Sequence, residues 1–241
     1  MLEKPSDQAR GLLALELRPV TRVVPVVVSP GRLDSLELLW ALESGLQRMG
    51  LAVGVVEGLH GLTPHDAAQG HRAVLTHWLE GVPPGTVTLL HAPLDALAVL
   101  LADSLARPLV ALGNEPASLV QSYNAVKVLW QVAGLQAIVM PLAEHTVGLA
   151  DTATALQTTL RDLSAHRLEM TPAIWPLEYH ANGSRNPCGG AEACLLKVLD
   201  SALMLQDFDE SSHHVDTHSR RCQTPADQNI GVSHVHRQRH A

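Results

Sequence analysis

Two patterns of hydrophobic and polar positions alternate along most of the chain. Short, continuous apolar runs, which predict buried strands, are separated by longer segments with apolar residues three or four apart, which predict helices. The first unit shows both patterns. Val26–Val28 form a β-branched run, residues 29–33 have the composition of a turn, and apolar residues then recur at helical spacing up to Gly50.

The same alternation continues to residue 175. We expect further strands at 51–56, 86–91, 108–112 and 135–140, a last strand within 167–175, and helices at 68–79, 96–105, 118–132 and 151–166. Continuously apolar strands between helices are typical of a parallel sheet covered on both faces. The predicted fold is therefore α/β, a doubly wound, mostly parallel sheet flanked by helices. Pro25 is expected at the first residue of its strand, because a central strand tolerates proline poorly.

Composition divides the chain into four regions. Residues 1–20 form a polar lead with a short helix, residues 21–175 form the α/β domain, and residues 176–206 form a turn-rich loop followed by an amphipathic helix, Ala191–Leu205. Residues 207–241 are polar and rich in histidine, which predicts a disordered tail. Membrane-surface helices are rich in Lys and Arg, but Ala191–Leu205 has Lys197 alone, so we expect it to pack on the protein's own core or on a partner.

Charge and composition exclude several function classes. The net charge of −7 argues against nucleic-acid binding, which needs a basic surface, and an aromatic content of 3% argues against stacking on single strands. Three cysteines, all late in the chain, indicate a reducing compartment and not a disulfide framework. The first residues have no apolar leader segment, so we expect a cytoplasmic protein.

The turn after the first strand lies where nucleotide-binding α/β proteins hold phosphate. A phosphate loop needs several glycines, a lysine for the phosphates and a Ser or Thr for Mg²⁺, whereas this turn has Gly31 and no lysine. Asp34 and Glu37 have the spacing of a capping box at the helix start. A carboxylate there would satisfy the amides that a phosphate would use. The turn is therefore predicted to be closed by its own side chains.

Four segments together resemble the MinD/ParA family of deviant Walker A ATPases, and most closely its flagellar branch, FlhG/FleN. DQARGLL, in the lead, is similar to the DQAxxLR helix of that branch, and the strand–turn–helix from Val28 to Gly50 matches the deviant Walker A unit in length. VGVVEGLHGLTPHDAAQG and LGNEPASLVQSYNAVKVL are similar to the DADxGxxNxDxxxG and TPEPTSLTDAYALIK elements. The resemblance implies a P-loop NTPase-like fold of MinD/ParA type.

The departures from the family pattern fall on its chemistry. By this alignment Pro30 replaces the signature lysine, Ser35 the Walker lysine and Leu36 the Mg²⁺-binding Ser/Thr. Three residues stand at or beside switch positions: Glu57 at one switch aspartate, the retained Asp66, and His91 in place of the carboxylate that ends the third strand. The degenerate loop positions are Ser29, Pro30, Gly31, Asp34, Ser35 and Leu36. Because phosphoryl transfer depends on metal and lysine charge, we expect a pseudo-ATPase with no catalytic residues and no cofactor.

The resemblance also implies a partner. In the flagellar branch the DQAxxLR helix docks on the GTPase FlhF and stimulates it. It implies that Asp7, Gln8 and Leu12 contact an FlhF-type GTPase here, although Leu13 stands where the branch has arginine. We expect a regulator of flagellar placement or number that works through protein contacts.

Two alternatives stay open from the sequence. The first is an active, divergent ATPase that uses ATP and Mg²⁺ to switch a dimer; the oligomeric state is not determined by the sequence. The second is a metal-handling protein that uses the tail, against which a solvated tail is favoured because no CxxC or HExxH motif anchors it. The tail residues concerned are His213, His214, His218, Cys222, His234, His236 and His240, and a metal between Cys188 and Cys194 is disfavoured by their spacing.

Overall fold

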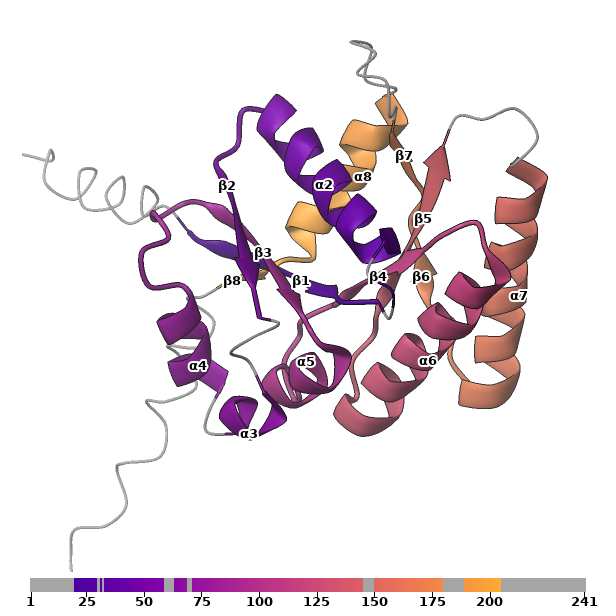
Figure 1. Cartoon of the computed structure of the whole chain (residues 1–241), viewed down its shortest axis with the longest axis horizontal. Helices are drawn as coiled ribbons and strands as arrows, with labels where there is room; N and C mark the ends of the chain where they lie inside the picture. The colour runs from indigo at the N-terminus through magenta and orange to yellow at the C-terminus, as the bar shows by residue number, and fades with distance from the viewer. Residues whose placement is uncertain are drawn as a thin grey trace, which may run out of the picture.

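A mostly parallel β-sheet lies between two layers of helices in the computed structural model (Figure 1), which describes residues 20–29, 31, 33–58, 63–68, 71–144, 150–179 and 189–204. The predicted α/β class, with a mostly parallel sheet flanked by helices, is confirmed. Asp7, Gln8, Leu12, Pro30, Cys188 and the whole histidine-rich tail lie outside the described residues.

The sheet has the strand order β2-β3-β1-β4-β5-β6. β7 also pairs with β5, further along that strand than β6 does, and β8 pairs with β1. All of these pairings are parallel except that of β8 with β1. The strands are β1 (Arg22–Val27), β2 (Val53–Glu57), β3 (Val87–Ala92), β4 (Leu109–Leu112), β5 (Ile138–Glu144), β6 (Ala173–Ile174), β7 (Leu177–Tyr179) and β8 (Leu203–Met204). Parallel pairing places the carboxyl ends of β1 to β5 at one edge of the sheet and their amino ends at the other.

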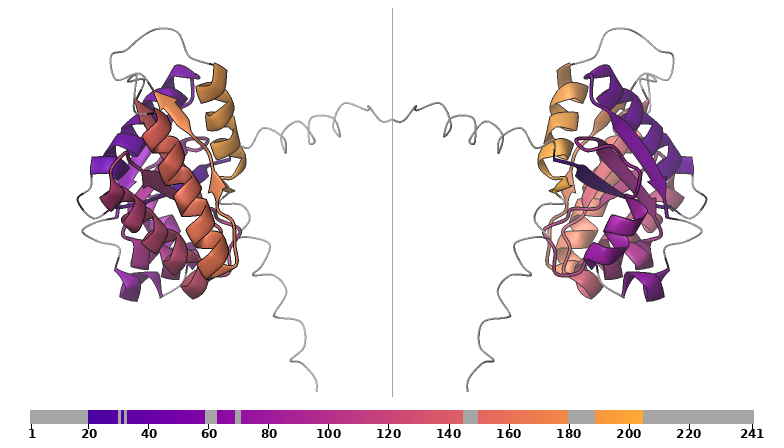
Figure 2. Two further views of the ribbon diagram at one scale, coloured as in Figure 1. Left: turned by 90° about the vertical axis from the view of Figure 1, so that its right-hand side faces the viewer. Right: turned by 90° about the vertical axis from the view of Figure 1, so that its left-hand side faces the viewer.

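Helices cover both faces of the sheet (Figure 2), and an apolar core lies on each face. On one face α2 and α8 pack over β1, β3, β4 and β5, and on the other α4, α5, α6 and α7 cover the sheet. The helices are α2 (Leu33–Arg48), α3 (Pro64–Ala67), α4 (His71–Trp78), α5 (Leu94–Leu100), α6 (Pro116–Ala133), α7 (Ala150–Leu168) and α8 (Gly189–Asp200). Within the described residues, no helix is both long and apolar enough to cross a membrane.

Pro25 lies in the middle of a central strand, so its predicted place at the strand start is wrong. The N–H of Arg22 donates to the carbonyl of Thr86, just before β3 (3.3 Å), and the N–H of Val28 donates to that of Ala92, at the end of β3 (3.0 Å). Because amides alternate sides along a strand, the imide nitrogen of Pro25 faces away from β3. On that side β8 pairs with Arg22 and Val23, and β4 first pairs at Val26. Proline therefore falls between two partner strands, where no amide is required.

Three predicted helices have different limits in the structure. The helix expected at 68–79 is found as α4, His71–Trp78, and a separate short helix that was not expected, α3, comes before it, capped by Thr63 and begun by Pro64. The helix expected at 96–105 is α5, which begins at Leu94 and ends at Leu100.

The helix expected at Ala191–Leu205 ends at Asp200, and Leu203–Met204 form β8. At its amino end, one side of β1 pairs with no other strand of the described chain, and Leu203 and Met204 form an antiparallel pair with it there. This pairing replaces the last predicted turn of the helix.

α8 belongs to the same core as the α/β units before residue 175. Leu195, Val198 and Leu199 are buried beside α2, as the amphipathic pattern predicts for packing on the protein's own core. Cys194 is also buried there; burial raises the pKa of its thiol, and the nearby Lys197 charge partly opposes that shift. With β7 and β8 in the sheet, the α/β unit extends to Met204 within the described chain.

Candidate functional site at the carboxyl ends of β1 and β4

The strand order reverses between β1 and β4. β1 continues through α2 to β2, on one side of the sheet, and β4 continues through α6 to β5, on the other side. α2 and α6 also cover opposite faces. In open α/β sheets, ligands bind outside the carboxyl ends of the strands at such a switch point. The loops after β1 and β4 therefore form the candidate site.

The loop after β1 is held by a side chain of the helix that follows it. The backbone N–H of Ser29 donates to Oγ of Ser35 (3.2 Å), and Ser35 is fully buried in the first turn of α2. Gly31 has a positive φ of 79°, a conformation that glycine adopts at little cost, so it allows this tight turn. An amide that would face an anion in a phosphate loop is thus bonded within the protein.

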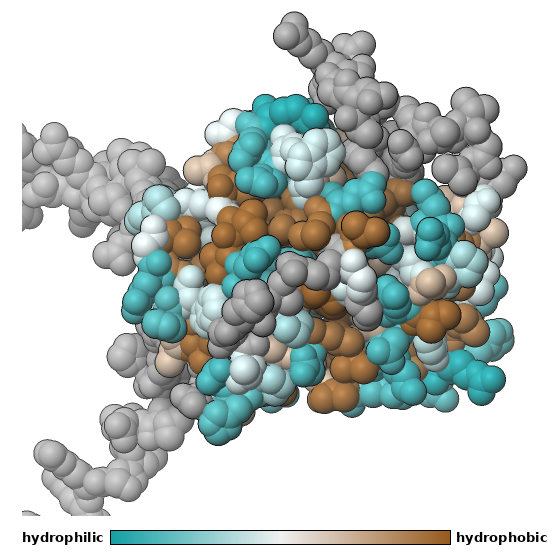
Figure 3. Space-filling model, viewed as in Figure 1, coloured by the Kyte–Doolittle hydropathy of each residue, from teal (hydrophilic) through white to brown (hydrophobic). Residues whose placement is uncertain are grey.

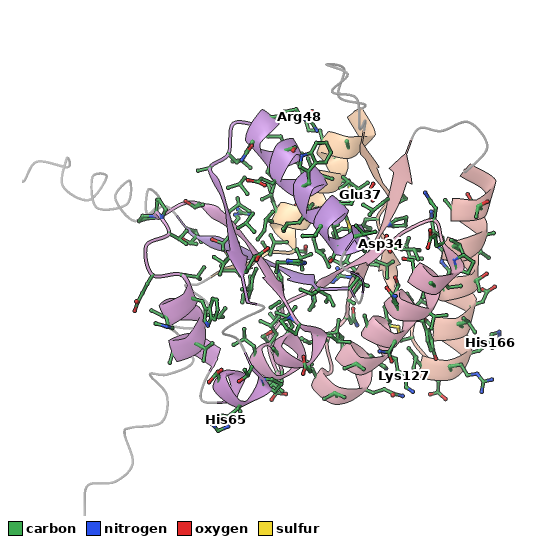
Figure 4. All side chains as sticks on the ribbon, in the orientation of Figure 1. Asp34, Glu37, Arg48, His65, Lys127 and His166 are labelled. Atoms are coloured by element: carbon green, nitrogen blue, oxygen red, sulfur yellow. The ribbon has the colours of Figure 1, made fainter. Side chains whose placement is uncertain are left out.

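Asp34 fills the space between the two loops. A Cβ built on Gly113, directly after β4, would lie 2.6 Å from Oδ1 of Asp34 and 2.8 Å from its Cγ and Oδ2. Asp34 lies at the start of α2 (Figure 4). Its carboxylate therefore lies against the backbone of Gly113. This contact places a negative charge in the crevice at the switch point.

The predicted capping box of Asp34 and Glu37 needs a correction. α2 begins at Leu33, so Asp34 lies in its first turn and not at the N-cap. A side chain does hold the turn, but it is the hydroxyl of Ser35, which accepts from the loop, and not a carboxylate; Asp34 contacts Gly113 after β4 instead. The sequence could not show this second contact because it joins residues 79 positions apart.

The loop after β4 is closed in the same way. The buried N–H of Gly113 donates to Oγ of Ser118 (2.7 Å), in the first turn of α6. Ser122, one turn further on, donates its hydroxyl to the carbonyl of Ala111 in β4 (2.7 Å). Sequence reasoning did not select Gly113 or Ser118 as site residues. The available signal was a glycine after a buried strand followed by two serines four apart on the next helix.

Two of the three residues predicted at switch positions, Glu57 and His91, lie side by side at this edge of the sheet. Glu57 and His91 are in register at the ends of β2 and β3, and the N–H of Gly58 donates to the carbonyl of His91 (2.8 Å). His91 is fully buried, and Val26 of β1 is its register partner on the other side. Within the described residues, no group of three or more His, Cys, Asp or Glu side chains could hold a metal ion.

Asp66 is engaged in a capping box. Its carboxylate accepts from the N–H (3.2 Å) and the hydroxyl (2.6 Å) of Thr63, while the hydroxyl of Thr63 accepts from the N–H of Asp66 (3.2 Å). The hydrogen bond from the Thr63 side chain, followed by that from its backbone, lowers the pKa of this carboxyl. The arrangement fixes the start of α3 and gives Asp66 a structural role.

An apolar surface adjoins the closed crevice. Leu33, Leu36 and Trp40 are 78%, 38% and 48% exposed, and their spacing of three and four residues places them along one side of α2. In Figure 3 hydrophobic residues lie toward the lower end of this helix, while hydrophilic and intermediate residues cover its upper end. Exposed apolar patches of this kind mark interaction sites more often than isolated exposed residues do.

Comparisons with protein-family models and with curated proteins gave no match to this chain.

Proposed function

We propose that this protein is a non-catalytic regulator, a MinD/FlhG-like pseudo-ATPase that acts through protein contacts in the cytoplasm, in the control of flagellar placement or number. The observation that carries the proposal is the closed crevice at the switch point. The amides of Ser29 and Gly113 both donate to serine hydroxyls, and the Asp34 carboxylate lies between the two loops.

The chemistry of the crevice supports the absence of nucleotide turnover. Phosphoryl transfer is catalysed mainly by positioning and by positive charge from lysine and Mg²⁺. Here the residue aligned with the Walker lysine, Ser35, is buried and holds the loop, and the side chain that contacts the loop after β4 is the carboxylate of Asp34. A phosphate group would have to displace Asp34 and would meet its negative charge.

The contact surfaces supporting a regulatory role lie at two places. The apolar side of α2, with Leu33, Leu36 and Trp40, offers a surface for a protein partner beside the crevice. The lead resembles a helix that docks on an FlhF-type GTPase, with Asp7 and Gln8 as the contact residues. In this proposal the fold keeps the shape of a nucleotide switch and has lost its ligand.

Thermal unfolding with and without Mg²⁺-ATP and Mg²⁺-ADP tests the proposal. A ligand at about 100 times its Kd stabilises the native state by about 2.7 kcal/mol, which raises the Tm by several degrees for a domain of this size. We expect no shift at millimolar nucleotide. A clear, saturable shift would contradict the proposal and favour the divergent ATPase that switches with ATP.

The partner is tested by the GTPase rate of a purified FlhF-type protein. We expect the full-length chain to raise that rate and the Gln8→Ala variant to lose the effect. Lys127→Ala, an exposed change on α6, serves as the matched control and should behave as the wild type. An unchanged GTPase rate at saturating protein would exclude this partner.

A further inference from the structure

A pocket opens at the other edge of the sheet, at the amino ends of β1 and β4. Its volume is about 480 Å³, within the range of small-molecule sites, and it is lined by Leu105, Arg107, Trp175, Lys197, Asp200, Ser201, Ala202 and Met204. We infer that this pocket binds a small organic anion, a carboxylate or phosphate group carried on a flat apolar body. The inference is independent of the proposed function, which rests on the opposite edge.

Arg107 and Trp175 form the floor on which such a ligand would rest. The guanidinium carbon of Arg107 lies 5.5 Å from the centre of the Trp175 ring, a cation–π contact that holds both side chains. Arg107 stands two residues before β4, and the N–H of Trp175 donates to the carbonyl of Val139 in β5 (2.9 Å). Both residues are therefore fixed to the sheet.

Arg107 lacks an acceptor for part of its guanidinium. Its Nε atom is buried and has no hydrogen-bond partner within the described chain. Arg107 as a whole is only partly buried and lines the pocket, so a ligand would contact its exposed atoms and not the buried Nε. Because the guanidinium presents its donors as a planar fork, the matching acceptor is a carboxylate or a phosphate.

The remaining lining favours the same class of ligand. Lys197 adds a second positive charge and Asp200 one negative charge, which leaves the pocket with a net charge of about +1 by formal counting. Leu105, Ala202 and Met204 supply apolar contact, and the last carbonyls of α8 already accept from Ser201, Ala202 and Arg22. A ligand with an anionic end and an apolar body matches both parts of this lining.

The test uses the indole N–H signals of the ¹⁵N-labelled full-length protein, which has four tryptophans. The Trp175 signal is assigned from its loss in Trp175→Phe. Benzoate and phenyl phosphate are the anionic probes, and benzamide is the neutral probe of similar shape. We expect at least one anionic probe to shift the Trp175 signal saturably at millimolar concentration, with benzamide about tenfold weaker or more, since charge-assisted hydrogen bonds are about twice as strong as neutral ones.

Variants assign the effect to Arg107. Arg107→Gln should weaken binding about tenfold or more, whereas Arg48→Gln, an exposed change in the last turn of α2, should leave it unchanged. Should Arg107→Gln fail to fold, Lys197→Gln, at an exposed position, replaces it and should weaken binding severalfold. The inference is overturned by the absence of any saturable Trp175 shift, by equal binding of benzamide, or by wild-type affinity in a folded Arg107→Gln or Lys197→Gln protein. A shift with phenyl phosphate alone would assign the site to phosphate esters, and one with benzoate alone to carboxylic acids.

Discussion

The two edges of the sheet differ in how their polar groups are satisfied. At the carboxyl edge, the amides after β1 and β4 donate to Ser35 and Ser118, and Asp34 occupies the space between the loops. At the amino edge, the Nε of Arg107 is buried without an acceptor, beside an open pocket. In this type of fold the ligand site usually lies at the carboxyl edge. Here the loop amides at that edge donate to serine hydroxyls of the protein itself. A fold therefore indicates where a site is common, and the side chains decide whether one is present.

The largest effect expected at the closed edge is that of Gly113→Ala. The new Cβ would lie 2.6–2.8 Å from the carboxylate of Asp34, which would have to move, so we expect a loss of about 1–3 kcal/mol in the free energy of unfolding. Denaturant unfolding measures it.

Two further variants show whether the carboxylate is the cause. Asp34→Ala should remove most of the cost of Gly113→Ala when the two are combined. Gly54→Ala, where the nearest atom is 3.7 Å from the new Cβ, is the matched control and should cost less. Equal costs for the two glycine variants would mean that Asp34 does not fill the crevice.

Ser118→Ala tests the hydrogen bond that closes the second loop. It leaves the buried N–H of Gly113 without its acceptor, which should cost about 1–3 kcal/mol of stability, toward the lower end if water reaches the amide. Ser122→Ala is the control, because it removes a hydroxyl that donates to the carbonyl of Ala111, a residue that is also paired with Met140 of β5. We expect Ser118→Ala to have the lower denaturation midpoint, and the reverse ranking would contradict the assignment.

Gly45→Ala tests whether a short contact is costly wherever it occurs. Its Cβ would lie 2.6 Å from Cδ1 of Leu195, as close as the contact at Gly113. Leu195 is buried, so crowding it should cost about 1–3 kcal/mol, but alanine favours the helix over glycine by up to about 1 kcal/mol, so the net loss should stay below about 2 kcal/mol. A larger loss in the free energy of unfolding would show that Leu195 cannot move away from the new methyl group and that α8 is packed rigidly on α2.

The smallest effect should come from the charge of Asp66, away from both sites. Because its pKa is lowered in the folded state, the carboxylate stabilises the protein above the unfolded-state pKa, and this stability is lost as the pH falls through the folded-state pKa. Asp66→Asn should therefore lower the Tm slightly at neutral pH. The difference from the wild type should vanish well below about pH 4. A difference that stays constant with pH would exclude the carboxylate charge as its source.

Local patterns predicted the elements and the class of the fold. Apolar runs and helical spacing located β1 to β5 and the helices between them, because burial on both faces leaves a strong imprint on composition. The same reasoning predicted a closed turn after the first strand, but with the carboxylates of Asp34 and Glu37 as the closing groups, whereas the hydroxyl of Ser35 accepts from the loop. It also placed the buried face of α8, since an amphipathic stripe marks the side that faces the core.

Tertiary structure decided what depends on partners distant in the sequence. Pro25 is accommodated by a gap between β8 and β4, and β8 exists because the edge of β1 pairs with residues near 204. The contact of Asp34 with Gly113 and the stacking of Arg107 on Trp175 also join residues far apart in the sequence. The chain by itself determined which segments are strands and helices and that the first turn closes on itself. Only the tertiary structure decided that Asp34 lies between the loops at the carboxyl edge and that a pocket is open at the amino edge. Both features depend on contacts between residues far apart in the sequence, which no local pattern records.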